Sequence, residues 1–208
     1  MLIARELPKP AHLCAKAWNR AENARILEAF PAYETVGIEL TDPISSFVES
    51  EWIDSLLKEL EGDLESESSV VHEIPVCYEM GEDIQKVSEF LHLPVEQIIA
   101  AHSGTTYCCA AVGFCPGFGY LKSLPSQLRG LPRLSSPRVR VEPGSVGITG
   151  EQTAVYPLAR PGGWRIVGRT PLCLVDVRES YFPVSAGDLV RFHPIDSSEF
   201  TRRVGERL

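Results

Sequence analysis

The chain has 208 residues, of which 44% are hydrophobic and 23% are charged, and its formal net charge is −8. This length and composition are typical of a globular protein with one large domain or two small ones. The negative charge argues against a nucleic-acid-binding protein, because contact with phosphates requires a basic surface.

The sequence carries no sign of a membrane or secretory segment. No stretch approaches the ~20 consecutive apolar residues that span a bilayer. Residues 1–8 lack the basic start and the long apolar run of a signal peptide. We therefore expect a cytoplasmic protein without a membrane partner.

Charge is divided unevenly along the chain. Residues 1–82 contain 17 acidic and 6 basic residues, whereas residues 83–208 contain 11 acidic and 14 basic residues, 12 of which are arginine. Arginine binds carboxylates and phosphates through paired hydrogen bonds. The asymmetry indicates two domains, 1–80 and 81–208, the second facing anionic small molecules or an acidic partner. The alternative is that these arginines are surface residues that serve only solubility, which would give the same number of basic residues.

The first 80 residues read as a small α/β domain. Residues 20–30 have apolar side chains along one side of a helix, and Pro31 would end it. A strand is predicted over residues 35–40. The clearest helix covers residues 51–60, where Trp52, Leu56 and Leu60 recur at a spacing of four.

A solvated loop and a strand follow. Residues 61–69 are rich in acids and serines, and residues 70–78 alternate as a strand in which Pro75 marks a bulge or an edge. Two short helices then form a connector. Asp83 is expected to cap the first, Pro94 to open the second and Gly104 to end it.

From residue 105 onward, short strand-like runs alternate with turns rich in glycine and proline. Six strands are predicted, over residues 106–112, 145–149, 153–156, 164–168, 172–177 and 189–193. Short strands at this spacing, with few helices among them, are typical of an antiparallel barrel or sandwich. The fold class is therefore α+β, a small α/β domain followed by an antiparallel β-barrel or sandwich.

Two segments, residues 113–121 and 161–164, place aromatic side chains beside glycine and proline. Rigid loops that carry aromatics often form a pocket or a partner surface. Each aromatic alone could instead fill the core. Together the segments predict one site in which Tyr120 and Trp164 contact substrate. The residues expected to shape its loops are Pro116, Gly117, Gly144, Gly162 and Gly163.

Four polar residues are candidates for chemistry. His102, at the end of the second connector helix, could transfer a proton near pH 7, or could merely bond the last helical carbonyls. Arg133 and Arg138 flank a turn-rich segment that could aim both guanidinium groups at one carboxylate. They could instead tie the loop to carbonyls of the barrel. Gln152 could hydrogen-bond an amide.

Cofactor motifs are weak. Residues 144–150 have glycine at every third position but lack the Lys-Ser/Thr ending of a P-loop, so we expect them to let strands approach closely rather than to hold a nucleotide. The six cysteines form no CxxC pair and have no zinc-like spacing with histidine, so no metal site is expected. Most should be buried thiols, and Cys115 alone is a candidate nucleophile.

An ordered set of motifs resembles the family that contains the B subunit of 5-oxoprolinase, the bacterial sporulation-kinase inhibitor and allophanate hydrolase subunit 1. The resemblance is dense over residues 70–195 and is carried by residues 74–78, Asp83, His102, 113–121, 132–133, 137–138, 143–148, Gln152, 156–157, 161–164 and 168–170. It implies a small α/β domain followed by a cyclophilin-like β-barrel.

The resemblance also implies a function, as one component of an ATP-dependent enzyme that opens the lactam of 5-oxoproline to give L-glutamate. The A and C subunits of that enzyme would be its partners, and ATP would bind with their help because this chain has no nucleotide motif. His102, Arg133, Arg138 and Gln152 would then line a cleft that the C subunit completes. The alternatives are an inhibitor of a sensor histidine kinase and a carboxyltransferase-type component of an allophanate- or urea-degrading system. A peptidyl-prolyl isomerase ranks last, because fold alone does not license activity.

Overall fold

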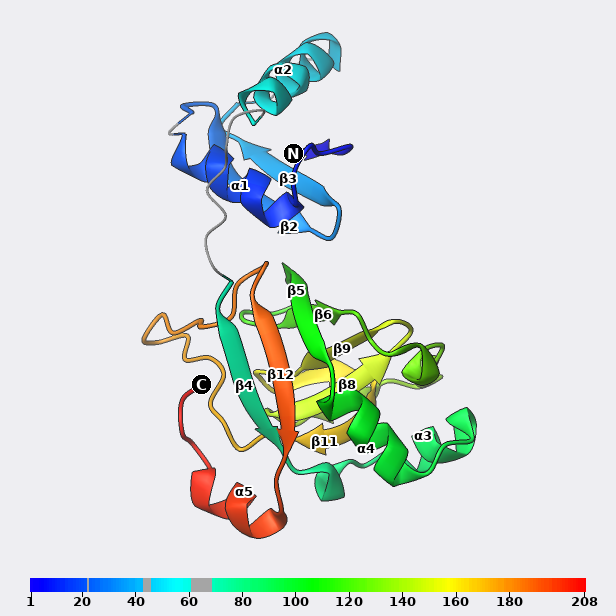
Figure 1. Ribbon diagram of the computed structural model, residues 1–208. Coiled ribbons are helices and arrows are strands. Elements are labelled where there is room, and N and C mark those ends of the chain that lie inside the picture. The colour runs from blue at the N-terminus through cyan, green and yellow to red at the C-terminus, as the bar shows by residue number, and fades with distance from the viewer. Residues whose placement is uncertain (22, 43–45, 61–68) are drawn as a thin grey trace. The chain divides into compact units, whose positions relative to one another are not determined.

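The chain forms two compact units, Met1–Ser68 and Ser69–Leu208, in a computed structural model (Figure 1). The structure describes residues 1–208 except 22, 43–45 and 61–68, and also leaves out the side chains of residues 46–51 and 59. The loop predicted over residues 61–69 therefore lies almost wholly outside the described residues. The second unit is described in full, from residue 69 to residue 208.

The first unit is a three-stranded antiparallel sheet with two helices. Helix α1 (Ala11–Arg20) and helix α2 (Ser46–Glu59) meet where the Trp18 indole donates a hydrogen bond to the Leu56 carbonyl at 3.2 Å. Both of these side chains are buried in the core of the unit. The strand order is β1 (Leu2–Ala4), β3 (Thr35–Leu40) and β2 (Ile26–Ala32).

The predicted helix over residues 20–30 is wrong, whereas the strand over 35–40 is confirmed. α1 ends at Arg20, and β2 pairs with β3. The Asn19 side chain donates to the Ala29 carbonyl and accepts from the Ala29 amide, each at 2.7 Å. Because these bonds and the pairing with β3 satisfy the backbone in extended form, they override the local helical pattern. The helix predicted over 51–60 is confirmed as α2, which begins earlier.

The second unit is built on one sheet, ordered β4–β12–β5–β6–β9–β8–β11. β4 and β12 are parallel, and the other neighbours are antiparallel. β4, which falls before residue 80, thus pairs within this second unit. The bounds are β4 (Val71–Val76), β5 (Thr106–Val112), β6 (Gly119–Lys122), β8 (Ser145–Thr149), β9 (Gln152–Val155), β11 (Arg165–Arg169) and β12 (Leu189–Pro194).

The α+β class is confirmed, but the sheet is not a closed barrel. Within residues 69–208, its edge strands β4 and β11 are joined by a single bridge beyond the end of β4. The Cys77 amide donates to the Arg169 carbonyl at 2.8 Å, and the Arg169 amide donates to the Cys77 carbonyl at 3.0 Å. Closure needs a full ladder between the edge strands, and the chain instead turns into a short 3-10 helix, Tyr78–Met80.

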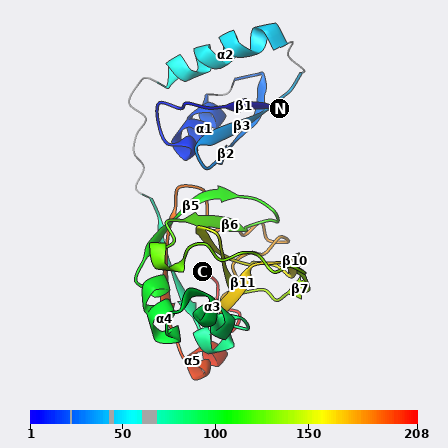
Figure 2. The ribbon, with the colours of Figure 1, turned by 90° about the vertical axis from the view of Figure 1, so that its right-hand side faces the viewer.

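Helices and a ribbon surround this sheet. α3 (Ile84–Leu91) and α4 (Val95–Ser103) confirm the predicted connector, with Pro94 directly before α4 and Gly104 at its end. The expected cap by Asp83 is wrong, because its side chain makes no capping hydrogen bond. Figure 2 shows a separate ribbon at the edge of the unit. The remaining elements are the ribbon strands β7 (Arg138–Val141) and β10 (Arg160–Gly162), a 3-10 helix (Ser126–Leu128) and α5 (Ser197–Arg203).

Five of the six strands predicted after residue 105 are confirmed, within one or two residues of their bounds. The strand over residues 172–177 is wrong. Its backbone forms only isolated bridges within the second unit, between Cys173 and Arg207 and between Asp176 and Tyr181. The segment is apolar because it covers the core, not because it belongs to the sheet.

Candidate functional site

The loop between β5 and β6 is tightly folded around an exposed aromatic residue. Its amides bond within the loop, from Cys115 to the Gly113 carbonyl at 2.8 Å and from Phe118 to the Cys115 carbonyl at 3.1 Å. Phe114 lies between them with a φ of 68°, and its side chain is 58% exposed. A bulky residue with positive φ is strained, and such strain is often found at functional sites.

Phe118 forms the centre of an aromatic cluster that unites the two predicted loops. It is buried, and its ring centroid lies 5.0 Å from Tyr120, 5.2 Å from Tyr156 and 5.6 Å from Trp164, in edge-to-face contacts. Phe114 adds its ring at 5.2 Å from Phe118. Edge-to-face pairs of this kind stabilise rigid packing. The sequence thus predicted the convergence of the loops, although it did not single out Tyr156.

Most of the cluster is core rather than open surface. Trp164 is 5% exposed and Tyr156 is 2% exposed, whereas Tyr120 is half-buried. Burial raises the pKa of the Tyr156 hydroxyl, and the Trp164 backbone and the charges of Arg133 and Arg138 partly counteract this. Among the predicted aromatic contacts, Tyr120 is therefore better placed to touch a ligand than Trp164, whose ring is buried in the cluster.

Glycine is required where the second loop crosses Tyr156. A Cβ on Gly162 would lie 2.4 Å from the Tyr156 hydroxyl oxygen, closer than any side chain can tolerate. Gly163 has more space, since its Cβ would be 3.7 Å from the Arg133 Cβ. The Leu134 amide donates to the Gly163 carbonyl at 2.7 Å and so joins the arginine-bearing turn to the cluster.

The Arg138 guanidinium forms an ion pair with the buried carboxylate of Asp83. Its Nη2 donates to both oxygens of Asp83 at 2.8 Å, and its Nε donates to Glu82 at 3.1 Å. Asp83 is 1% exposed and also accepts from the Ile166 amide at 2.8 Å. This ion pair explains why Asp83 does not cap α3. The Arg138 guanidinium is thereby bound within the fold, so its predicted contact with substrate stays a prediction that this geometry does not favour.

Arg133 and Arg160 instead present their side chains at the surface beside the cluster. Arg133 lies close enough to act electrostatically on Tyr156, and Arg160 acts on the Cys115 thiol. Burial raises the pKa of Cys115 and the Arg160 charge opposes this in part, which does not favour a nucleophilic thiolate. Arg160 was missed in the sequence, although its position directly before Pro161 and Gly162 was the available signal.

His102 lies apart from the aromatic cluster, within the larger core of the second unit. It is fully buried and stacks on Phe192 at 4.7 Å. Thr153 donates its hydroxyl to the Gly147 carbonyl at 3.1 Å, so it accepts from His102 Nε2 at 2.9 Å. Tyr78 then donates to Nδ1 at 2.7 Å. Burial lowers the His102 pKa to about 3.

This arrangement makes His102 neutral and places both ring nitrogens in hydrogen bonds inside the core. Proton transfer to a substrate remains a prediction for His102, and its surroundings do not favour it. Gln152 opens β9 opposite Thr149 and is half-buried. Its predicted bond to an amide also stays a prediction.

The glycine-rich segment is built into the sheet. Residues 145–149 form β8, and every residue of this strand is buried. A Cβ on Gly144 would lie 2.3 Å from the Thr170 carbonyl oxygen, and one on Gly147 would lie 3.1 Å from the Trp164 Cβ. The predicted close approach of neighbouring backbone is confirmed, and these residues do not form a phosphate-binding loop.

Among the described residues, no three or more His, Cys, Asp or Glu side chains are placed to hold a metal ion. In the same part of the chain, no helix is both long enough and apolar enough to cross a membrane.

Residues 3–183 match the carboxyltransferase domain family, subdomains C and D, and the chain belongs to this family. The relatives it matches include bacterial proteins named as the B subunit of 5-oxoprolinase. The one from Escherichia coli O157:H7 is 39% identical over 92% of this chain and 91% of its own length. The one from Bacillus subtilis (strain 168) is 36% identical over 84% of this chain and 78% of its own length. The resemblance inferred from the motifs is confirmed.

Solved structures agree with this assignment. TTHA0988 is 34% identical with a TM-score of 0.79 and is matched over 94% of this chain, which spans only 40% of the TTHA0988 chain. PH0987 from Pyrococcus horikoshii is 33% identical with a TM-score of 0.59 over 95% of both chains. The urea carboxylase of Kluyveromyces lactis has a TM-score of 0.71 at 16% identity, a likeness of fold alone.

Proposed function

We propose that this chain is the B subunit of an ATP-dependent 5-oxoprolinase complex that hydrolyses 5-oxo-L-proline to L-glutamate in the cytoplasm. The observation that carries the proposal is 36–43% identity to three bacterial proteins that bear this subunit name. The first two are matched over more than three quarters of both chains. The surface arginines beside the aromatic cluster support it, because the proposed substrate is an anion with a small ring.

In this proposal Arg133 binds the substrate carboxylate through a charge-assisted hydrogen bond. Phe114 and Tyr120 offer aromatic surface to the lactam ring. Arg138 keeps the turn in place through Asp83 and does not contact substrate. The proposal also keeps Gln152 as a partner of the lactam amide and His102 as a proton-transferring group. The local geometry supports these two roles less than it supports the role of Arg133.

ATP and the remaining machinery are assigned to the partner A and C subunits. The glycines of residues 144–150 belong to a buried strand and its turns, and such a strand offers no array of free amides for phosphates. Residues 144–150 therefore do not fit a nucleotide site on their own. We propose that activation of the lactam carbonyl by ATP takes place on the partners or where they meet this chain.

The alternative functions receive less support. A carboxyltransferase-type component for urea or allophanate rests on a relative at 16% identity, and no feature of the described residues favours a kinase inhibitor. We also propose a cyclophilin-like relationship for the second unit, supported by the near closure of its sheet at Cys77 and Arg169.

The test is reconstitution with candidate A and C subunits, with glutamate release measured with and without ATP. We expect no turnover by this chain alone. Arg133→Ala should lower kcat/KM about 10- to 100-fold, the value of one or two bonds to a charged group. Arg202→Ala on α5 is the matched control and should leave turnover unchanged. Full ATP-dependent activity of the isolated chain, or unchanged activity of Arg133→Ala, would contradict the proposal.

A further inference from the structure

The turn that carries Arg133 leads into a ribbon that the large sheet does not include. Strands β7, which follows this turn, and β10, which precedes Gly163, form a two-stranded sheet of their own. Contacts outside that ladder must therefore fix where the ribbon and the turn lie relative to the large sheet. Arg138, the first residue of β7, supplies such contacts through its side chain.

Asp83 links the ribbon to an edge strand of the large sheet. Both of its carboxylate oxygens accept from Nη2 of Arg138 at 2.8 Å, and one of them also accepts from the Ile166 amide of β11 at 2.8 Å. The Asp83 amide donates to the Ile166 carbonyl at 2.8 Å. This one residue thus bonds β11 through its backbone and its side chain, and bonds the ribbon at the same time.

The turn is also bonded to the segment that leads into β11. The Leu134 amide donates to the Gly163 carbonyl at 2.7 Å, and Nε of Arg165 donates to the Pro132 carbonyl at 3.3 Å. Arg133 lies between these two bonded residues, so its backbone is held against the start of β11. Both segments that place Arg133 are therefore bonded, directly or through the ribbon, to the same buried carboxylate.

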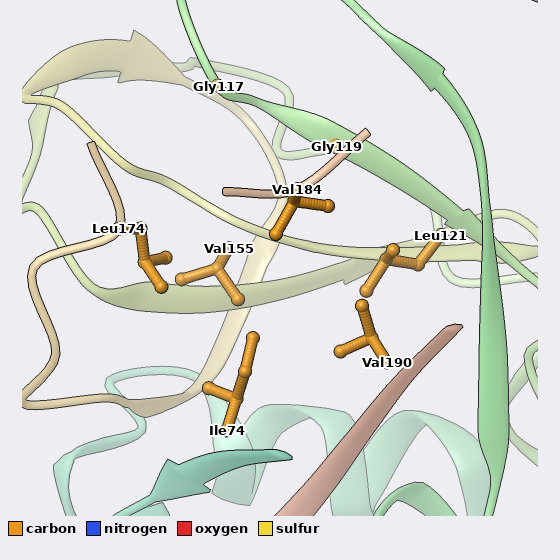
Figure 3. A pocket seen from close by; sticks show the side chains of 8 residues that line it. All are labelled: Ile74, Gly117, Gly119, Leu121, Val155, Leu174, Val184 and Val190. Carbon is orange, nitrogen blue, oxygen red and sulfur yellow. The ribbon is translucent and has the colours of Figure 1, made fainter. Parts of the chain in front are cut away.

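The apolar pocket of this unit offers the ribbon no alternative anchor. Its lining residues are all aliphatic or glycine, and they come from β4, β6, β9, β12 and neighbouring loops (Figure 3). Aliphatic side chains give a guanidinium group no hydrogen-bond acceptor. The carboxylates that bind Arg138 are those of Asp83 and Glu82.

Burial distinguishes the two carboxylates. Asp83 is 1% exposed, whereas the side chain of Glu82, which accepts from Nε of Arg138 at 3.1 Å, is 60% exposed. A buried ion pair adds little net stability, because taking both charges out of water offsets most of their attraction. Its directional hydrogen bonds nevertheless favour one geometry. The main contribution of Asp83 is therefore to the direction of Arg138 and of the turn before it.

We propose that Asp83 is a positioning residue for the substrate site, holding the turn that presents Arg133 through Arg138 and Ile166. The inference rests on the proposed function, in which Arg133 binds the substrate carboxylate. Asp83 does not touch substrate, because its carboxylate is buried and both oxygens are already bonded. Loss of its charge should weaken substrate binding and leave the chemical step almost unchanged.

The test uses the full chain reconstituted with the A and C subunits, with glutamate release measured over a range of 5-oxoproline concentrations. Asp83→Asn keeps an acceptor for Ile166 but removes the charge that Arg138 binds. We expect KM to rise about 5- to 20-fold and kcat to change less than about twofold. Glu142→Gln is the matched control, because it removes an exposed carboxylate bonded to Arg140 of the same ribbon, and should leave KM unchanged.

A double mutant separates positioning from stability. If Asp83 acts through Arg133, Arg133→Ala should lower kcat/KM less in the Asp83→Asn chain than in the unchanged chain, by about fivefold or more. A smaller folded fraction would instead lower the apparent kcat, leave KM unchanged and act independently of Arg133→Ala. An unchanged KM in Asp83→Asn, or independent effects of the two substitutions, would overturn the inference.

A second variant covers the case in which Asp83→Asn loses its cooperative unfolding transition. Arg138→Lys keeps the charge but lacks the forked group that binds two carboxylates, so KM should rise about threefold or more. An unchanged KM would again overturn the inference. If the unchanged chain releases no glutamate with the A and C subunits, the proposed function fails and the inference fails with it. If it does release glutamate while the variants keep its KM, only the role of Asp83 fails.

Discussion

His102 shows how a residue type that suits catalysis can instead organise a core. Donors and acceptors alternate along one line, from Tyr78 through His102 and Thr153 to the Gly147 carbonyl. Every polar atom in this line has a partner, and such satisfied buried networks specify one packing arrangement. The line joins the region before α3 to strands β8 and β9.

The low pKa of His102 predicts a pH-dependent stability. Its folded value of about 3 lies below the ~6.5 of an unfolded chain. The unfolded state therefore binds an extra proton between these two values, and stability falls as the pH drops from about 6.5 toward 3. Between pH 7 and pH 5 the loss from this group should be about 2 kcal/mol.

Urea unfolding of the protein and of His102→Gln at both pH values measures this loss. Other titrating groups contribute equally to both proteins, so the difference in unfolding free energy between them isolates His102. That difference should shrink by about 2 kcal/mol at pH 5. A difference that stays constant would show that His102 does not resist protonation in the folded chain.

The structure brings together only some of the residues that the sequence predicted for one site, and His102 lies apart from the aromatic cluster. The sequence placed Arg133, Tyr120 and Trp164 near one another because each lies in or beside a glycine- and proline-rich turn. It could not show that Arg138 is bound by Asp83, because the two are 55 residues apart and only the fold brings them together. Arg160 was missed for a related reason, since its neighbours come from a distant loop.

At the level of elements, strand β8 is flanked by two glycines, Gly144 and Gly150, whose backbone conformations other residues rarely adopt. Gly144 and Gly150 both have positive φ, at +84° and +55°. They differ in their surroundings. A Cβ on Gly144 would meet the Thr170 carbonyl oxygen at 2.3 Å, whereas nothing lies within 4 Å of one on Gly150. The Thr170 amide also donates to the Gly144 carbonyl at 2.8 Å, so the two segments cannot move apart without losing that bond.

Alanine at these two positions should separate the effect of φ from the effect of contact. Gly150→Ala should cost about 1 kcal/mol of unfolding free energy, the penalty of a left-handed conformation. Gly144→Ala should cost about 3 kcal/mol or more, because overpacking against backbone is added. Chemical denaturation measures both. Similar losses in the two variants would mean that the Gly144 contact relaxes easily.

The two wrongly predicted elements have backbones whose hydrogen-bond partners lie outside the predicted segment. Residues 20–30 have a helical pattern and residues 172–177 have a strand-like one, but neither pattern shows where those partners are. β2 is held by Asn19 and β3, and Cys173 forms a bridge with Arg207 near the C-terminus. The helix bounded by Pro94 and Gly104 was confirmed, whereas Pro31, which was expected to end a helix, lies within β2.

At the scale of the whole molecule, charge and core follow the two units. Residues 1–68 contain 14 acidic and 6 basic residues, whereas residues 69–208 contain 14 of each. Each unit also has its own buried cluster, around Trp18 and Ile38 in the first and around Tyr107 and Val190 in the second. The acidic excess of the chain therefore belongs to the first unit, and the arginines of the proposed site belong to a unit that is electrically balanced.

A separate core predicts that residues 69–208 fold without the first unit. A chain of this length can bury roughly two thirds of its surface and reach about 5–15 kcal/mol of stability. Trp164 is the sole tryptophan of the fragment and is 5% exposed within the aromatic cluster. Its fluorescence should therefore be blue-shifted in the native fragment and should shift to the red in one cooperative transition with urea. A red-shifted native spectrum or a gradual transition would mean that the aromatic cluster needs the first unit to form.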